Sequence, residues 1–131
     1  MQEQHLYEYS VLRIVPQVER EEFLNVGVVL YCSRPQFLKV KYSLDHRRLS
    51  AFSEKLDVAE VESYLCAFER ICNGDREGGP IGKLPVAERF RWLTATRSTI
   101  VQSSKVHPGF CTSPGEMLEK LFNQMVGLLC P

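Results

Sequence analysis

Apolar and polar positions follow the short period of β-strands in the first third of the chain. Residues 6–15 are rich in aromatic and β-branched side chains, and Pro16 ends this segment. Residues 22–32 carry no charge after Glu22, which is typical of a central strand that is apolar on both faces. Residues 37–43 alternate between apolar and polar side chains. The pattern therefore predicts three consecutive strands.

The hydrophobic period lengthens to that of a helix in the middle of the chain. Asp45 is suited to cap a short helix, and Asp57 with Glu60 three residues later forms a capping box for a longer one. Apolar residues then recur at steps of three and four over residues 58–72, which is the stripe of an amphipathic helix. Residues 73–74, Asn-Gly, predict its end.

The last third of the chain mixes loops with short elements. Residues 73–85 contain four glycines and two prolines and are expected to form a loop. A short helix is predicted over residues 86–93 and a strand over residues 99–103, whereas residues 105–112 are expected to be irregular. A second capping box at residues 113–116, with proline at its first helical position, predicts a C-terminal helix.

The order of these elements indicates an α+β fold. Three consecutive strands with short links favour antiparallel pairing, and the helices are grouped after them. A chain of 131 residues without an internal repeat suits one domain, residues 1–131. We expect a mainly antiparallel sheet of about four strands with helices packed on one face.

Charge and composition exclude some classes of function. Lys and Arg number 16, and Asp and Glu also number 16, so the formal net charge is zero. A protein that binds nucleic acid through bulk positive charge is therefore not favoured. The beginning of the sequence lacks the features of a secretory signal, and the longest apolar run is far shorter than the roughly 20 residues that span a bilayer. We expect a cytoplasmic protein that does not enter a membrane.

Motifs for metals, cofactors and the common enzymes are missing. The five cysteines form no CxxC pair and the three histidines are scattered, so we expect neither a metal site nor a cofactor. The cysteines are expected to be small buried side chains in a reducing compartment. The segment at residues 78–83, GGPIGK, departs from a phosphate-binding loop because Glu77 stands where the first glycine is required. The sequence thus favours a protein that is not an enzyme, although it leaves the question open.

The predicted hairpin places polar and aromatic residues on one face. Val15 opposite Phe23 would set Arg13 opposite Asn25 and Val11 opposite Gly27. Even-numbered residues of the two strands would then face the core, and the odd-numbered face would hold Tyr7, Tyr9, Arg13, Phe23, Asn25, Gly27 and Tyr31. Such a surface could stack a base or hold a phosphate. The alternative is that Arg13 forms a salt bridge with Glu22 or Glu19 that fixes the hairpin.

A second concentration of candidate residues lies in residues 86–109. Arg89, Arg91, Arg97 and Lys105 against Glu88 give a local charge of +3, and Phe90 and Trp92 lie between the arginines. Arg97 and Ser98 suit an anion site, and His107 could act as an acid or base near neutral pH. The alternative is an amphipathic helix whose apolar side chains pack while its arginines face water.

Three strings carry a resemblance to a known family: YEYSVLRIVP, EEFLNVGVVLYC and ERFRWLTATRSTIVQSSKVHPG. Together they resemble the bacterial domain-of-unknown-function family 3037 over nearly the whole chain. Members of that family are often encoded beside HipA-like kinases, so the resemblance implies an accessory or antitoxin-like protein with a kinase partner. Gene adjacency is an association and gives no mechanism.

Two hypotheses follow for the function. The favoured one is a small binding module that docks a partner protein, with Tyr7, Tyr9, Tyr31 and Trp92 as candidate interface residues. The alternative is a nucleotide- or phosphodiester-binding protein or enzyme, for which nucleic acid or a nucleotide would be the ligand. Its candidate polar cluster is Arg13, Glu22, Asn25, Arg91, Arg97, Ser98 and His107, provided that the first hairpin lies near residues 97–109. The sequence does not define the oligomeric state.

Overall fold

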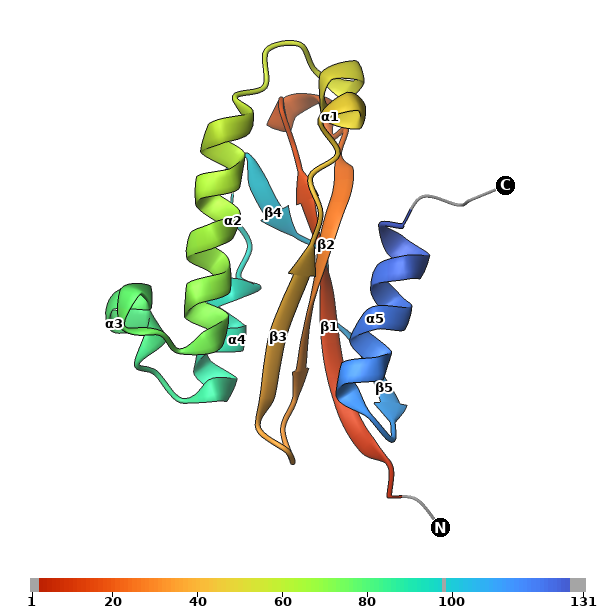
Figure 1. Ribbon diagram of the computed structural model, residues 1–131, viewed down its shortest axis with the longest axis vertical. Coiled ribbons are helices and arrows are strands. Elements are labelled where there is room, and N and C mark those ends of the chain that lie inside the picture. Colours follow the sequence, from red (N-terminus) through yellow and green to blue (C-terminus); the bar gives the residue numbers. More distant parts are fainter. Residues whose placement is uncertain (1–2, 98, 128–131) are drawn as a thin grey trace.

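A five-stranded antiparallel sheet lies between helices on both of its faces (Figure 1). The computed structural model describes residues 3–97 and 99–127. The strands are β1 (His5–Ile14), β2 (Leu24–Cys32), β3 (Phe37–Tyr42), β4 (Val101–Ser103) and β5 (His107–Cys111). The α-helices are α1 (His46–Phe52), α2 (Val58–Asn73), α3 (Gly79–Gly82), α4 (Val86–Leu93) and α5 (Pro114–Met125). The predicted α+β class and antiparallel sheet are confirmed.

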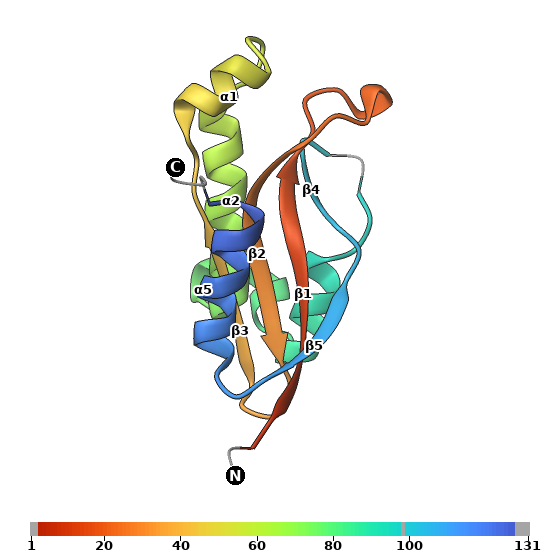
Figure 2. The same cartoon turned by 90° about the vertical axis from the view of Figure 1, so that its right-hand side faces the viewer.

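The long strand β1 organises the sheet. The strand order is β3-β2-β1-β4, and β5 also pairs with β1. The end of β1 pairs with β4, whereas its first half pairs with β5. The two short strands therefore follow one another along the same edge of β1, as Figure 2 shows.

Strand β5 lies in the segment that was expected to be irregular, so this prediction was wrong. Its sequence, HPGFC, contains Pro108 and Gly109 and lacks the alternation that indicates a strand. Proline has no N–H to donate, but it is tolerated in a strand at the edge of a sheet. Pairing with β1 supplies the order that the local sequence does not indicate.

Helices cover both faces of the sheet, which corrects the expectation of helices on one face. Helices α2 and α4 pack on one face around a core that includes Leu12, Val29 and Phe68. Helix α5 packs on the other face around a second core that includes Val28 and Leu30. The physical reason lies in β2, whose successive apolar residues point to opposite faces, so that both faces exclude water.

A β-bulge changes the predicted register of the first hairpin. Arg13 pairs with Asn25 as predicted, but Val11 lies opposite Val28 instead of Gly27. The shift falls between Leu12 and Arg13, where β2 contains one extra residue. Hairpin patterns alone do not reveal such an insertion.

The bulge also divides the predicted faces of β2. Tyr31 packs on the core beneath α2 and α4, so it lies on the face opposite to Tyr7 and Arg13. Val28 and Leu30 pack beneath α5, whereas Leu24 and Val26 pack on the α2 side. The predicted even-numbered core face is therefore shared between two cores.

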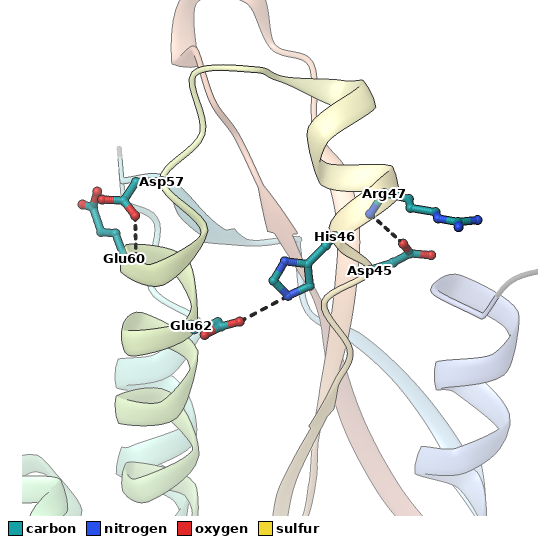
Figure 3. A network of polar contacts seen from close by, with 6 residues as sticks. All are labelled: Asp45, His46, Arg47, Asp57, Glu60 and Glu62. Carbon is teal, nitrogen blue, oxygen red and sulfur yellow. Dashed lines mark hydrogen bonds and ion pairs between the residues drawn. The ribbon is translucent and has the colours of Figure 1, made fainter.

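Side-chain caps begin α1, α2 and α5 at the predicted residues, and Figure 3 shows the first two. The carboxylate of Asp45 accepts hydrogen bonds from the backbone N–H groups of residues 47 and 48 at the start of α1. Asp57 accepts one from the backbone N–H of Glu60 at the start of α2. His46 Nε2 lies 3.4 Å from a carboxylate oxygen of Glu62, which links the two helices. These caps satisfy donors that a helix leaves open at its first turn.

Candidate functional site

The sheet separates the residues of the predicted polar cluster. Arg13, Asn25 and His107 lie on the face that α5 covers, because Asn25 bonds to α5 and the His107 ring contacts Tyr9. Arg97 lies on the other face, beside the core of α2 and α4. These side chains therefore do not converge on one ligand.

Arg13 and Asn25 form the polar part of the α5 face. The guanidinium of Arg13 lies 3.9 Å from the centre of the Phe23 ring, and burial lowers the pKa of Arg13. Asn25 donates from Nδ2 to the backbone carbonyl of Met125, at 3.2 Å. The Arg13 Nε and the Asn25 Oδ1 are both buried without a hydrogen-bond partner. The contacts with Phe23 and Met125 therefore hold Arg13 and Asn25 in place, while one donor of Arg13 and the acceptor of Asn25 have no partner.

The contacts of Asn25 serve the end of α5. Asn25 bonds to the carbonyl of Met125, and Arg48 Nη1 donates to the carbonyl of Val126 at 3.2 Å. Carbonyl groups at the C-terminal end of a helix lack partners within the helix, and basic side chains there interact favourably with the helix dipole. Asn25 and Arg48 therefore fasten α5 to the sheet.

Among the described residues neither Glu22 nor Glu19 pairs with Arg13, so the alternative of a salt bridge that fixes the hairpin was wrong. Glu22 forms an ion pair with Arg20, and both side chains are more than half exposed. Arg13 stacks on Phe23 instead. An exposed pair of this kind contributes little to stability.

Arg97 caps the end of α4 rather than joining an anion site with the other arginines. It donates to the backbone carbonyls of Trp92 and Leu93, and its guanidinium lies 4.2 Å from the centre of the Trp92 ring. Arg91 is exposed on the same helix. Ser98 lies outside the described residues. The alternative, an amphipathic helix whose arginines face water, holds for Arg91 but not for Arg89, which is half-buried and donates to the carbonyl of Gly82.

Three of the four candidate interface residues serve mainly in packing. Tyr7 is buried beneath α5, and Tyr9 lies half-buried with its ring centre 6.1 Å from that of Tyr7. Tyr31 is half-buried and stacks on Phe90 with ring centres 5.2 Å apart. Trp92 is 40% exposed. Of these four, Trp92 alone offers a large accessible surface.

A different apolar surface, which the sequence patterns did not predict, lies on β1 and β5. Leu6 and Phe110 are cross-strand partners and are 52% and 65% exposed, and Pro108 beside them is exposed as well. We call Leu6, Pro108 and Phe110 the β1/β5 apolar surface. Val106, 40% exposed, comes just before β5. This surface escaped notice because β5 itself was not predicted.

The described cysteines are mostly buried thiols, as expected. Cys32, Cys72 and Cys111 are buried, and Cys66 is partly exposed. Burial raises the pKa of Cys72 to about 12 and also raises the pKa of Cys32 and of Cys111. Cys130 lies outside the described residues. Because the thiolate is the nucleophile, Cys72 stays unreactive at neutral pH.

Alkylation of the folded protein should distinguish these thiols. With iodoacetamide at pH 8, we expect Cys66 to react at least about tenfold faster than Cys72 because it is accessible. Cys72 should remain slow at pH 10, since its pKa of about 12 keeps it protonated there. Mass spectrometry of the peptides measures each site, and urea-unfolded protein is the control. Equal rates at both sites in the folded protein would contradict the burial of Cys72.

A cluster of metal-binding side chains and a membrane-spanning helix are both missing from residues 3–97 and 99–127. No three side chains of His, Cys, Asp or Glu gather there closely enough to hold a metal ion. None of the helices in these ranges combines the length and the apolar character needed to cross a bilayer.

Comparison with known proteins agrees with the resemblance in the sequence. No curated protein and no solved structure matches the chain significantly. The family model described as "Protein of unknown function (DUF3037)" matches residues 9–126. This match includes all of β2 to β5 and most of β1. The chain therefore belongs to the DUF3037 family.

Proposed function

We propose that this protein is a binding module that docks a partner protein through the β1/β5 apolar surface. The observation that carries the proposal is the exposed cross-strand pair of Leu6 and Phe110. Phe23 and Trp92 are also exposed, but a guanidinium of the chain itself stacks on each of them. Exposed apolar side chains that gather at one place are typical of interaction sites.

The free edge of β5 favours contact through side chains over addition of a strand. β5 pairs with β1 on one side, and Pro108 is the second of its five residues. Because proline has no N–H, an incoming strand would lose one of the few hydrogen bonds that so short a strand offers. The partner is therefore expected to cover the side chains of Leu6 and Phe110.

The negative charge of Glu8 indicates which side chains the partner presents. Glu8 pairs with Pro108 across the strands. It is two residues from Leu6 along β1, so its side chain lies on the same face of the sheet as Leu6. Among the described residues, no cation forms an ion pair with Glu8. A partner that presents apolar side chains next to a lysine or arginine would complement this surface. The first candidate is the HipA-like kinase that the family resemblance implies.

Co-purification of matched variants tests the proposal. Tagged wild-type protein should retain a stoichiometric partner from its source cells at moderate salt. Phe110→Ser should reduce retention at least about tenfold, because an aromatic hot spot at the centre of an interface contributes about 2 kcal/mol or more. Val18→Ser is the control, since Val18 is 44% exposed but lies in the turn between β1 and β2.

Two results would contradict the proposal. One is equal retention of the partner by wild-type protein and Phe110→Ser. The other is the retention of no stoichiometric protein, together with no binding when the purified kinase is added. The thermal midpoint of both variants shows that they remain folded.

The alternative function, binding of a phosphate ligand, has less geometric support. It requires Arg13, Arg97 and His107 to converge on one ligand. Arg97 instead lies across the sheet from the other two residues. Arg97 also already donates to two carbonyls at the end of α4.

A further inference from the structure

A cavity of about 170 Å³ opens between α2, the end of α4 and β4. Helices α2 and α4 lie on the same side of the sheet in Figure 1, and β4 is a strand of the sheet that contacts α2. The lining is mostly apolar and includes Tyr64, Ala67, Phe68, Trp92, Arg97 and Ser103. None of the residues of the β1/β5 apolar surface takes part in it, so the cavity is independent of the proposed docking site.

The size of the cavity matches one ring. Apolar cavities of about 150 Å³ bind benzene in proteins, and this cavity is slightly larger. Phe68 from α2 and Trp92 from α4 supply aromatic walls, and Leu12 of β1 closes the cavity on the side of the sheet. A single six-membered ring therefore fits.

Two polar groups give the cavity a preference for an anion. Arg97 uses two of its five N–H donors on the carbonyls of Trp92 and Leu93, and no carboxylate among the described residues forms an ion pair with it. The hydroxyl of Ser103 is buried and has no hydrogen-bond partner. Buried polar groups are normally paired, so an unpaired hydroxyl in a cavity wall points to a ligand.

We propose that this cavity binds a small aromatic carboxylate with a single ring. The ring occupies the apolar space between Phe68 and Trp92. The carboxylate accepts hydrogen bonds from the remaining donors of Arg97, and a rotation of the Ser103 side chain, whose hydroxyl oxygen is buried without a ligand, brings a further donor to it. Stacking of the Arg97 guanidinium on Trp92 holds the cation at the rim of the cavity before a ligand arrives.

An NMR titration with two matched probes tests the proposal. Phenylacetate carries the ring and the charge, and phenylacetamide has nearly the same shape without the charge. We expect saturable shifts of backbone amides around residues 64–68, 92–97 and 101–103, with a Kd for phenylacetate of about 1 mM or tighter. Phenylacetamide should bind at least about tenfold more weakly, because it cannot form a charge-assisted pair with Arg97.

Three variants assign the binding to this cavity. Ala67→Leu narrows it at an exposed position of its lining and should weaken phenylacetate binding, and Arg97→Gln should remove the preference for phenylacetate over phenylacetamide. Arg91→Gln removes an exposed arginine of the same helix outside the cavity and should change neither Kd. Because Arg97 also caps α4, a thermal midpoint is recorded for each variant. Ala67→Leu and the pair of probes test the site even if Arg97→Gln does not fold.

Each of three results would overturn the proposal. The first is the lack of saturable shifts with phenylacetate up to about 10 mM. The second is equal affinity for phenylacetate and phenylacetamide. The third is unchanged phenylacetate binding by Ala67→Leu, which would place the ligand elsewhere on the protein.

Discussion

Gly27→Ala is expected to lower the free energy of unfolding by about 2 to 3 kcal/mol, the upper part of the range for forcing extra atoms into a packed core. A Cβ at this position would come within 2.8 Å of the carbonyl oxygen of Lys41 and within 2.8 Å of the Cβ of Tyr42. Neither neighbour is the free end of a flexible side chain, so strands β2 and β3 would have to separate. The cost should exceed the entropy gained by replacing glycine, about 1 kcal/mol at most.

The same substitution elsewhere in the chain is the control. Gly115→Ala near the start of α5 meets no atom within 4 Å, and alanine favours a helix over glycine. Its stability should be unchanged or raised by up to about 1 kcal/mol. Urea unfolding of both variants measures the difference. Equal stability of the two variants would contradict the close approach of β2 to β3.

Gly109→Ala is expected to lower the free energy of unfolding by about 2 kcal/mol through a clash with Tyr7. The two residues are cross-strand partners, and a Cβ on residue 109 would lie 2.5 Å from Cζ of the Tyr7 ring. The ring is buried in the core beneath α5, so it cannot move aside without exposing apolar surface. Gly109 thus makes room for Tyr7.

A double-mutant cycle separates this clash from other effects of the substitution. Tyr7→Leu removes the distal part of the ring, and in that background Gly109→Ala should cost less than about 0.5 kcal/mol. The coupling between the two sites should therefore be about 1.5 kcal/mol or more. An equal cost of Gly109→Ala in both backgrounds would show that Tyr7 does not fill the space above residue 109.

Local patterns predicted the elements whose own sequence contains their signals. The largely apolar segment of residues 22–32 indicated β2, and Asp57 and Ser113 marked the starts of α2 and α5. Each signal acts within a few residues, because a cap or an apolar stripe is a property of the segment itself. The register of Arg13 with Asn25 was also predicted, since both lie close to the turn that sets it.

Features that depend on distant parts of the chain could not be predicted in this way. β5 is a strand because it pairs with β1, about a hundred residues earlier, and its Pro-Gly pair conceals it. The bulge in β2 moves Tyr31 to the other face of the sheet. The predicted polar cluster required Arg97 and Arg13 to lie close together in the folded protein. The sheet separates them, and no local pattern in the sequence indicates this. The exposed pair of Leu6 and Phe110 became apparent only once β5 was placed.

Methyl cross-saturation NMR on the complex with the partner tests the central claim of docking through the β1/β5 apolar surface. The protein is deuterated and carries labelled methyl groups, and its unlabelled partner is irradiated. We predict that the methyl signals of Leu6 and Val106 lose the most intensity, whereas those of Val18 keep theirs. Unaffected Leu6 methyls, with the losses confined to α5 or to the turn at Val18, would contradict the claim.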